Sequence, residues 1–172
     1  MIPKHFSPFY KSKIDKMKNK KIKFIKLNKI VDLRNGDEVG SENYIDFFDK
    51  TETDIPFIRT EDLVNFEVNQ IPDKFAPESI YKKLNQNLKP SDILFTKDGK
   101  IGITAMVTEN DKIIISSGIE IIRLNEEKIK KEKIYITPEY LFALLGNKWT
   151  GYFQAIRNTA TLLLFHILEK ID

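Results

Sequence analysis

The sequence of 172 residues contains no cysteine. A disulfide-stapled scaffold and a zinc site built on thiolates are therefore excluded, and the absence fits the reducing conditions of the cytoplasm, where we expect the protein. No apolar run approaches the roughly 18 residues of a membrane-spanning helix. The N-terminus is rich in lysine and lacks the apolar segment of a secretory signal. We therefore expect no membrane partner.

Motifs for common reactions are absent as well. There is no phosphate-binding G-x-x-x-x-G-K-[ST], no G-x-G-x-x-G, no G-x-S-x-G of hydrolases and no [DNS]-P-P-[YFW] of adenine methyltransferases. The only histidines, His5 and His166, are too few for a zinc site. These absences predict a non-catalytic binding module without metal or cofactor.

One loose pattern leaves an enzymatic alternative open. Pro72-Asp73 followed by Asp98-Gly99-Lys100 fits the P-D…[DE]-x-K spacing of Mg²⁺-dependent nucleases. In such sites two carboxylates hold the ion and a lysine lies near the attacking water. Asp98 and Gly99 fall in a predicted turn, however, whereas the second carboxylate and the lysine need a rigid strand. A nuclease using Asp73, Asp98 and Lys100 is one alternative, and a protein-interaction module without DNA contact is another.

Positive charge is concentrated at the start of the chain. Residues 1–30 hold ten lysines and one acid, Asp15, which gives +9, and since the whole chain carries +3 the remainder carries −6. A basic segment before a mildly acidic body is typical of attraction to a polyanion. A solvated lysine face explains the same composition. The segment is also poor in arginine, the better bidentate reader of phosphate and guanine.

Local patterns predict an α+β fold with a twisted, largely antiparallel sheet and flanking short helices. Helices are predicted at residues 7–20, 77–84, 138–145, 150–157 and 161–170, and strands at 22–27, 55–59, 66–71, 92–96, 101–107, 113–115 and 119–124. The polar stretch 34–54 is predicted to be a long loop, and 126–133 an exposed charged segment. The Asp98-Gly99 pair between two apolar runs predicts a hairpin turn at 97–100. A core role is predicted for most of the aromatic residues Phe47, Phe48, Phe57, Phe95, Tyr140, Phe142, Trp149 and Phe153.

Residues 88–107, LKPSDILFTKDGKIGITAMV, resemble a motif of target recognition domains. These domains occur in the specificity subunits of type I restriction-modification systems and in fused type IIG-like DNA adenine methyltransferases. The matching residues are Pro90, Asp92, Ile93, Leu94, Asp98, Gly99, Ile101 and Gly102. Segments 30–40, 55–65, 113–124, 136–147 and 160–172 resemble the family in the same order. In the first of these, Gly36-Asp37-Glu38 stands where the family has Gly-x-Thr-Pro-Ser, so contacts made by that loop are not carried over.

The resemblance implies one target recognition domain over residues 22–172, preceded by a basic helix or connector over residues 1–21. It implies double-stranded DNA as a partner, with a methyltransferase subunit or domain and a restriction subunit acting in the same complex. Full specificity subunits carry two such domains, so the chain resembles a half-subunit or a fragment of a fused enzyme.

In such domains a sheet carries loops into the major groove, where each base pair shows a distinct pattern of donors and acceptors. Lys97 and Lys100 flank the predicted hairpin tip and are candidates for DNA contact. Arg59 ends a predicted strand and could read guanine, although an ion pair with Glu61 or Asp62 is favoured. The remaining candidates are Arg157, Asn158 and Thr159, which could equally cap a helix. Residues 116–118, Ser-Ser-Gly, are predicted to form a structural bend.

Overall fold

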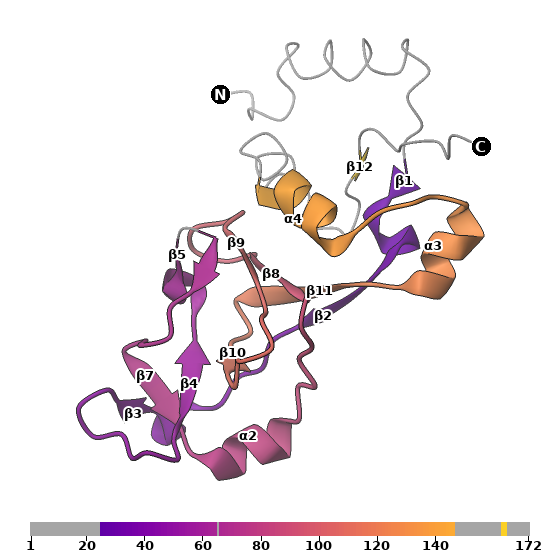
Figure 1. The fold of residues 1–172 in the computed structure, drawn as a ribbon. Helices are drawn as coiled ribbons and strands as arrows, with labels where there is room; N and C mark the ends of the chain where they lie inside the picture. The colour runs from indigo at the N-terminus through magenta and orange to yellow at the C-terminus, as the bar shows by residue number, and fades with distance from the viewer. Residues whose placement is uncertain (1–24, 65, 147–162, 165–172) are drawn as a thin grey trace, which may run out of the picture.

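The computed structural model describes residues 25–64, 66–146 and 163–164, and its strands form two four-stranded sheets with helices around them (Figure 1). The first sheet has the order β2-β11-β8-β9 and is antiparallel throughout. Its strands are β2 (Val31–Asn35), β8 (Ile93–Thr96), β9 (Thr104–Met106) and β11 (Ile119–Leu124). The predicted α+β class with a largely antiparallel sheet is confirmed.

The second sheet has the order β10-β4-β7-β3. Its strands are β3 (Ile45–Asp46), β4 (Ile55–Ile58), β7 (Lys74–Ala76) and β10 (Ile114–Ile115). β10 pairs with β4 in parallel, whereas β7 is antiparallel to both of its neighbours. The stretch 34–54 is therefore less irregular than predicted, since it contains the end of β2 and all of β3.

Two further strand pairs are short. β5 (Leu63–Val64) pairs with β6 (Glu67–Val68), and β1 (Ile25–Lys26) pairs with β12 (Leu163–Leu164). The strand predicted over 66–71 is confirmed only at Glu67–Val68, since Phe66 adopts a left-handed φ of 69° just before β6 and residues 69–71 are not in a strand. The helix predicted over 161–170 is wrong at 163–164, where pairing with β1 imposes an extended backbone.

The helices predicted at 77–84 and 138–145 are confirmed as α2 (Glu78–Leu84) and α4 (Pro138–Gly146). A third helix, α3 (Glu126–Glu132), occupies the predicted charged segment. The Asn125 side chain caps it by accepting from the Lys128 backbone N–H at 3.0 Å. Acids in its first turn and lysines in its last turn interact favourably with the helix dipole. Three single 3₁₀ turns complete the described elements, namely η2 (Leu27–Lys29), η3 (Ser41–Asn43) and η4 (Thr60–Asp62).

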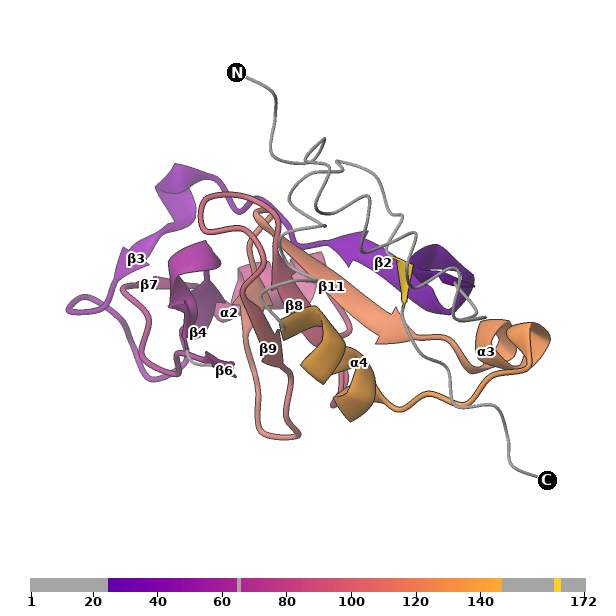
Figure 2. The ribbon, with the colours of Figure 1, turned by 90° about the horizontal axis from the view of Figure 1, so that it is seen from above.

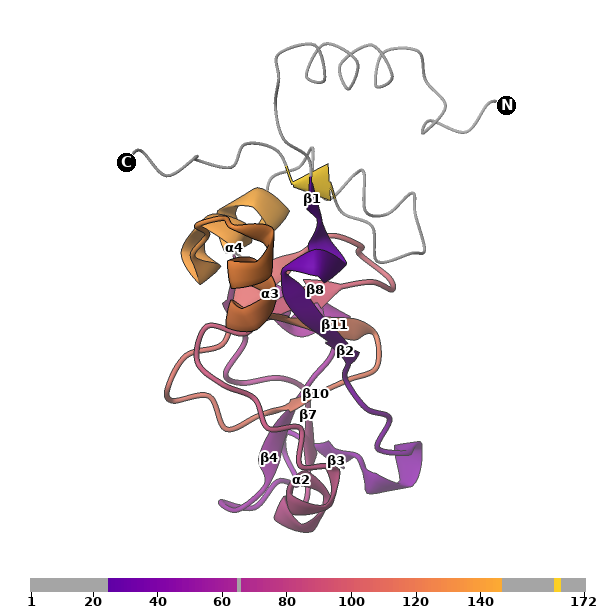
Figure 3. The ribbon, with the colours of Figure 1, turned by 90° about the vertical axis from the view of Figure 1, so that its right-hand side faces the viewer.

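Buried apolar side chains form three clusters. The first lies between α4 and the first sheet, which are neighbours in Figure 2. It includes Leu141 and Leu145 from α4 and Ile93 and Phe95 from β8. The second joins the two sheets, and includes Ile58 from β4 and Leu94 from β8. The third lies beneath α2 and is built from Val39, Ile55, Phe57, Ala76 and Ile114. α2 therefore covers one end of the molecule, while α3 and α4 lie at the other (Figure 3).

The prediction that the aromatic residues are mostly core holds only in part. Phe57 and Phe95 are buried, whereas Tyr140 is 40% exposed and Phe48 is 93% exposed. Phe48 is therefore a clear error of the sequence reading, since a large apolar ring does not by itself indicate burial. Trp149 and Phe153 lie outside the described residues, as do the predicted connector 1–21 and the helices predicted at 7–20 and 150–157. None of the described helices has the length and apolar character required to span a membrane.

Candidate nucleic-acid interface

Four loops meet beyond the C-terminal end of β4, and we call residues 35–38, 59–61, 97–100 and 116–118 the loop cluster. The backbone N–H groups of Lys97 and Asp98 both donate to the Gly118 carbonyl, at 3.0 and 3.3 Å. A Cβ placed on Gly99 would lie 3.3 Å from the Thr60 hydroxyl oxygen, and one on Gly118 would lie 2.9 Å from the Thr60 methyl carbon. The loops are thus in van der Waals contact, although they are far apart in the sequence.

The hairpin between β8 and β9 is confirmed, but its turn is wider than the predicted 97–100. β8 ends at Thr96 and β9 begins at Thr104, so the connection runs through residues 97–103. Gly99 and Gly102 adopt φ values of 65° and 92°, which a side chain would strain. The two glycines of the family-like motif therefore shape this loop.

Thr96 holds the loop together from inside. Its buried hydroxyl accepts the Ile103 backbone N–H at 2.9 Å and donates to the Lys100 carbonyl. The Gly102 N–H donates to the Thr96 carbonyl at 2.9 Å. The loop that carries Lys100 is therefore preorganised.

Replacing Thr96 by valine is expected to lower the free energy of unfolding by about 2 kcal/mol, because the Ile103 N–H and the Lys100 carbonyl lose their partner. Thr104 is the matched control: it is equally buried and its hydroxyl has no hydrogen-bond partner in the described structure. Thr104→Val should leave stability unchanged or raise it by about 1 kcal/mol. Urea unfolding of both variants checks this, and equal losses would refute the role given to Thr96.

Lys97 and Lys100 differ in how free their charges are. The Lys97 ammonium donates to the Asn35 side-chain oxygen at 3.0 Å. It also lies close enough to Glu120 to affect that group: burial raises the pKa of the Glu120 carboxyl, and the positive charge of Lys97 partly offsets the rise. Lys100 is exposed, and its ammonium has no partner among the described residues. Of the two, Lys100 is the more available to a phosphate.

Arg59 forms the predicted ion pair. Its guanidinium lies 2.5 Å from the Glu61 carboxylate and 3.9 Å from that of Asp73, and its Nε lies 4.0 Å from the Asp62 carboxylate. Asp62 is buried and accepts the Arg59 backbone N–H at 2.8 Å, and burial raises the pKa of this carboxyl. Arg59 is thus surrounded by acids, so reading a base would require it to leave them.

Gly36 is fixed by a close backbone crossing. A Cβ at this position would lie 2.2 Å from the Ser116 carbonyl oxygen and 2.3 Å from that of Ile115. The Gly36 N–H donates to the Ile119 carbonyl at 2.9 Å, and Ser117 donates to the Glu38 carboxylate. The bend at 116–118 is structural, as predicted, and it holds the 35–38 loop in place.

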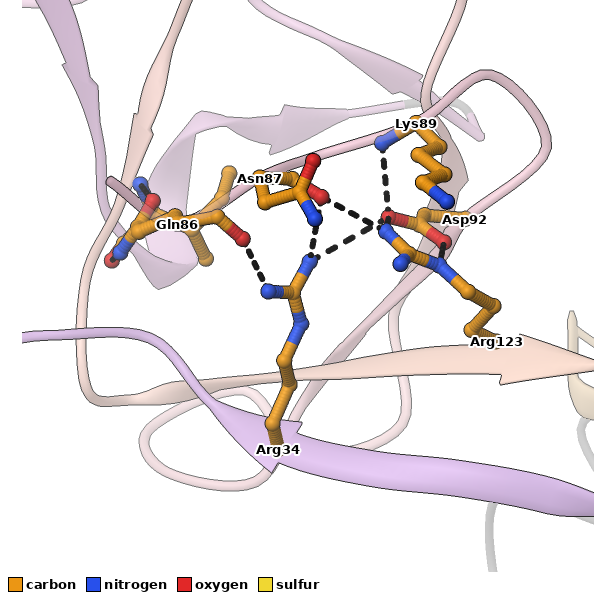
Figure 4. A network of polar contacts seen from close by, with 7 residues as sticks. Arg34, Gln86, Asn87, Lys89, Asp92 and Arg123 are labelled. Atoms are coloured by element: carbon orange, nitrogen blue, oxygen red, sulfur yellow. Dashed lines mark hydrogen bonds and ion pairs between the residues drawn. The ribbon is translucent and has the colours of Figure 1, made fainter. Parts of the chain in front are cut away.

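The sequence reading missed the role of Asp92, another residue of the family-like motif. Asp92 is 1% exposed and accepts two bonds of 2.6 Å from the Arg123 guanidinium (Figure 4). It also accepts the Lys89 backbone N–H at 2.9 Å and lies 3.5 Å from Arg34.

Hydrogen bonding to Asp92 raises the pKa of Arg123, whereas burial lowers the pKa of Arg34. These arginines also donate to the carbonyls of Gln86 and Asn87, which fastens the segment before β8 to the first sheet.

Gln86 connects the same segment before β8 to β10 and to the 35–38 loop. Its buried amide accepts the Ile115 N–H at 2.8 Å and donates to the Ile115 carbonyl at 2.7 Å, as a neighbouring strand would. The amide also donates to the Asp37 carboxylate at 2.9 Å. Gln86 therefore ties β10 to the 35–38 loop.

The geometry gives the nuclease alternative no support. Asp98 and Lys100 lie in the loop between β8 and β9, so the rigid strand that the chemistry needs is missing. Asp73 is exposed and pairs with Arg59. Among the described residues, no group of three or more His, Cys, Asp or Glu side chains is placed to hold a metal ion. The candidates Arg157, Asn158 and Thr159 lie outside the described residues and stay predictions.

Comparison with known proteins finds likeness in structure only. No protein-family model and no curated protein sequence matches the chain. The HsdS subunit from Thermoanaerobacter tengcongensis matches at a TM-score of 0.56 with 15% identity, covering 86% of this chain and 33% of that one. A chain from a structure on "complex assembly and conformational transition of the type I R-M system" matches at 0.51 with 16% identity, covering 87% and 34%.

The chain therefore shares its fold with about a third of the length of specificity subunits of type I restriction-modification systems. The resemblance predicted from the sequence is confirmed at the level of the fold.

Proposed function

We propose that this chain is a sequence-specific double-stranded DNA recognition domain of a restriction-modification system. It directs methylation or cleavage that a partner methyltransferase subunit or domain, or a restriction subunit, carries out in the cytoplasm, and it performs no chemistry itself. The observation that carries the proposal is the fold likeness to specificity subunits over 86% of the chain. In this proposal, residues 22–172 form one target recognition domain.

The loop cluster supports the proposal because it has the features of a reading surface. Its loops come from different parts of the chain, and hydrogen bonds within and between them hold them in place. Lys97 and Lys100 sit on the connection between β8 and β9, next to polar Asn35 and Thr60. Lysines position a protein on phosphates, while neighbouring polar groups read base edges.

Lys100→Ala is expected to weaken duplex binding by a similar factor for every sequence, because a phosphate contact carries no base information. The slope of log K against log salt should become shallower by about 0.9. Lys83→Ala is the control, since Lys83 is exposed on α2 at the opposite end of the molecule from α4. Fluorescence anisotropy across a salt series, with the methyltransferase present, measures both slopes. Equal slopes for Lys100→Ala and the wild type would contradict a phosphate contact.

A further inference from the structure

Phe48 is the most exposed of the large apolar side chains in the described structure, at 93%. It lies in the 46–54 loop, which connects β3 to β4 at the left-hand edge of the molecule in Figure 1. Its one ring contact is an edge-on approach to Phe47, with centroids 5.5 Å apart. A ring held in water in this way contributes little to folding and is available to a partner.

The 46–54 loop is ordered around this ring. Phe48 lies inside a turn, which closes where the Asp49 N–H donates to the Asp46 carbonyl at 2.9 Å. A second turn closes after it, where the Asp54 carboxylate accepts the Thr51 N–H at 2.7 Å and the Thr51 hydroxyl at 2.9 Å. Phe48 is therefore displayed by a preorganised loop, which lowers the entropy lost on binding.

The charge of the 46–54 loop favours a protein partner over DNA. Its only lysine, Lys50, lies over the Phe75 ring at 4.5 Å and the Phe47 ring at 5.3 Å. Asp49 and Glu52 are exposed carboxylates without a partner among the described residues. An exposed ring flanked by free carboxylates would meet repulsion at a phosphate backbone but attraction at a surface rich in lysine and arginine.

The position of the 46–54 loop also favours a protein partner over DNA. The 46–54 loop enters β4 at Ile55, whereas the loop cluster begins just after β4 ends at Ile58. Four extended residues span about 13 Å, so Phe48 is displayed at the end of this strand away from the loop cluster. A partner bound at Phe48 leaves the loop cluster free for DNA.

We propose that the 46–54 loop is a protein-docking element for the methyltransferase partner. Phe48 enters an apolar socket on that partner, and Asp49 and Glu52 pair with lysine or arginine side chains at its rim. The inference rests on the proposed function, because that function requires a methyltransferase to act with this chain.

The test is the affinity of the full chain for the methyltransferase polypeptide encoded with it, measured by isothermal titration calorimetry without DNA. Phe48→Ala is expected to weaken binding about thirtyfold, the loss typical of an aromatic anchor. Asp49→Lys with Glu52→Lys should weaken it more at low salt than at high salt. Tyr135→Ala is the matched control, since Tyr135 is a 66% exposed aromatic residue between α3 and α4.

Three results would overturn the docking role: no binding by the wild-type chain, equal losses for Phe48→Ala and Tyr135→Ala, or a Phe48→Ala loss in DNA affinity instead of partner affinity. The last would assign Phe48 to DNA. Duplex binding is measured separately with Lys100→Ala, so failure of the docking role and failure of DNA recognition are distinguishable.

Discussion

Replacing Asp92 by alanine is expected to lower the free energy of unfolding by about 3 kcal/mol, since it removes the buried half of an ion pair. Asp92 is 1% exposed and receives both bonds from Arg123 as well as the Lys89 N–H. The expected loss is at the lower end for such pairs because the Arg34 and Arg123 side chains are 36% and 26% exposed, and water can solvate them in the variant.

Urea unfolding measures the Asp92 effect, with Asp49→Ala as the control. Asp49 is an exposed aspartate of the 46–54 loop, so its loss should change stability by less than about 0.5 kcal/mol. A double-mutant cycle with Arg123→Met isolates the pair itself. A loss below about 1 kcal/mol for Asp92→Ala would contradict the structural role given to this network.

The second large effect is expected at Gly36, where Gly36→Ala should lower the free energy of unfolding by about 3 kcal/mol through overpacking. The added Cβ would lie 2.2 and 2.3 Å from two backbone carbonyl oxygens, which cannot turn away as a side chain could. Relief requires the 35–38 loop to separate from the 116–118 bend, and the Gly36 bond to Ile119 would be lost with it.

Gly118→Ala provides the comparison for Gly36. Its Cβ would lie 2.9 Å from the Thr60 methyl carbon, and the neighbouring atoms there belong to side chains rather than to backbone. Gly118→Ala should therefore cost less than Gly36→Ala when both are unfolded in urea. If Gly36→Ala proves as stable as the wild type, the close crossing at the loop cluster is incorrect.

The sequence predicted elements whose signals are local. α4 was anticipated from Thr137 and Pro138, and the Thr137 hydroxyl does accept the Tyr140 N–H at 3.2 Å. The hairpin at β8 and β9 was anticipated from Asp98-Gly99, and the Arg59 ion pair from the acids beside it. α3 could also have been found, because Asn125 followed by two glutamates and later lysines is a helix-start and helix-end pattern.

The features that were missed depend on contacts between distant parts of the chain. Asp92 and Arg123 are 31 residues apart, and Gln86 and Ile115 are 29 apart. No local pattern shows that these residues meet. The motif that contains Asp92 could therefore be matched to a family although the buried ion pair of Asp92 was not evident. The exposure of Phe48 was missed because the local sequence suggests burial, since an aromatic residue in an apolar pair is most often buried.

The central claim is sequence-specific recognition of duplex DNA, and selection from a pool of randomised duplexes tests it most directly. The chain together with its methyltransferase should enrich one defined sequence, bound at least about a thousandfold more tightly than unrelated duplex at physiological salt. The methyltransferase without this chain should enrich none. Failure of the complex to enrich any sequence, or the same enrichment without this chain, would contradict the account.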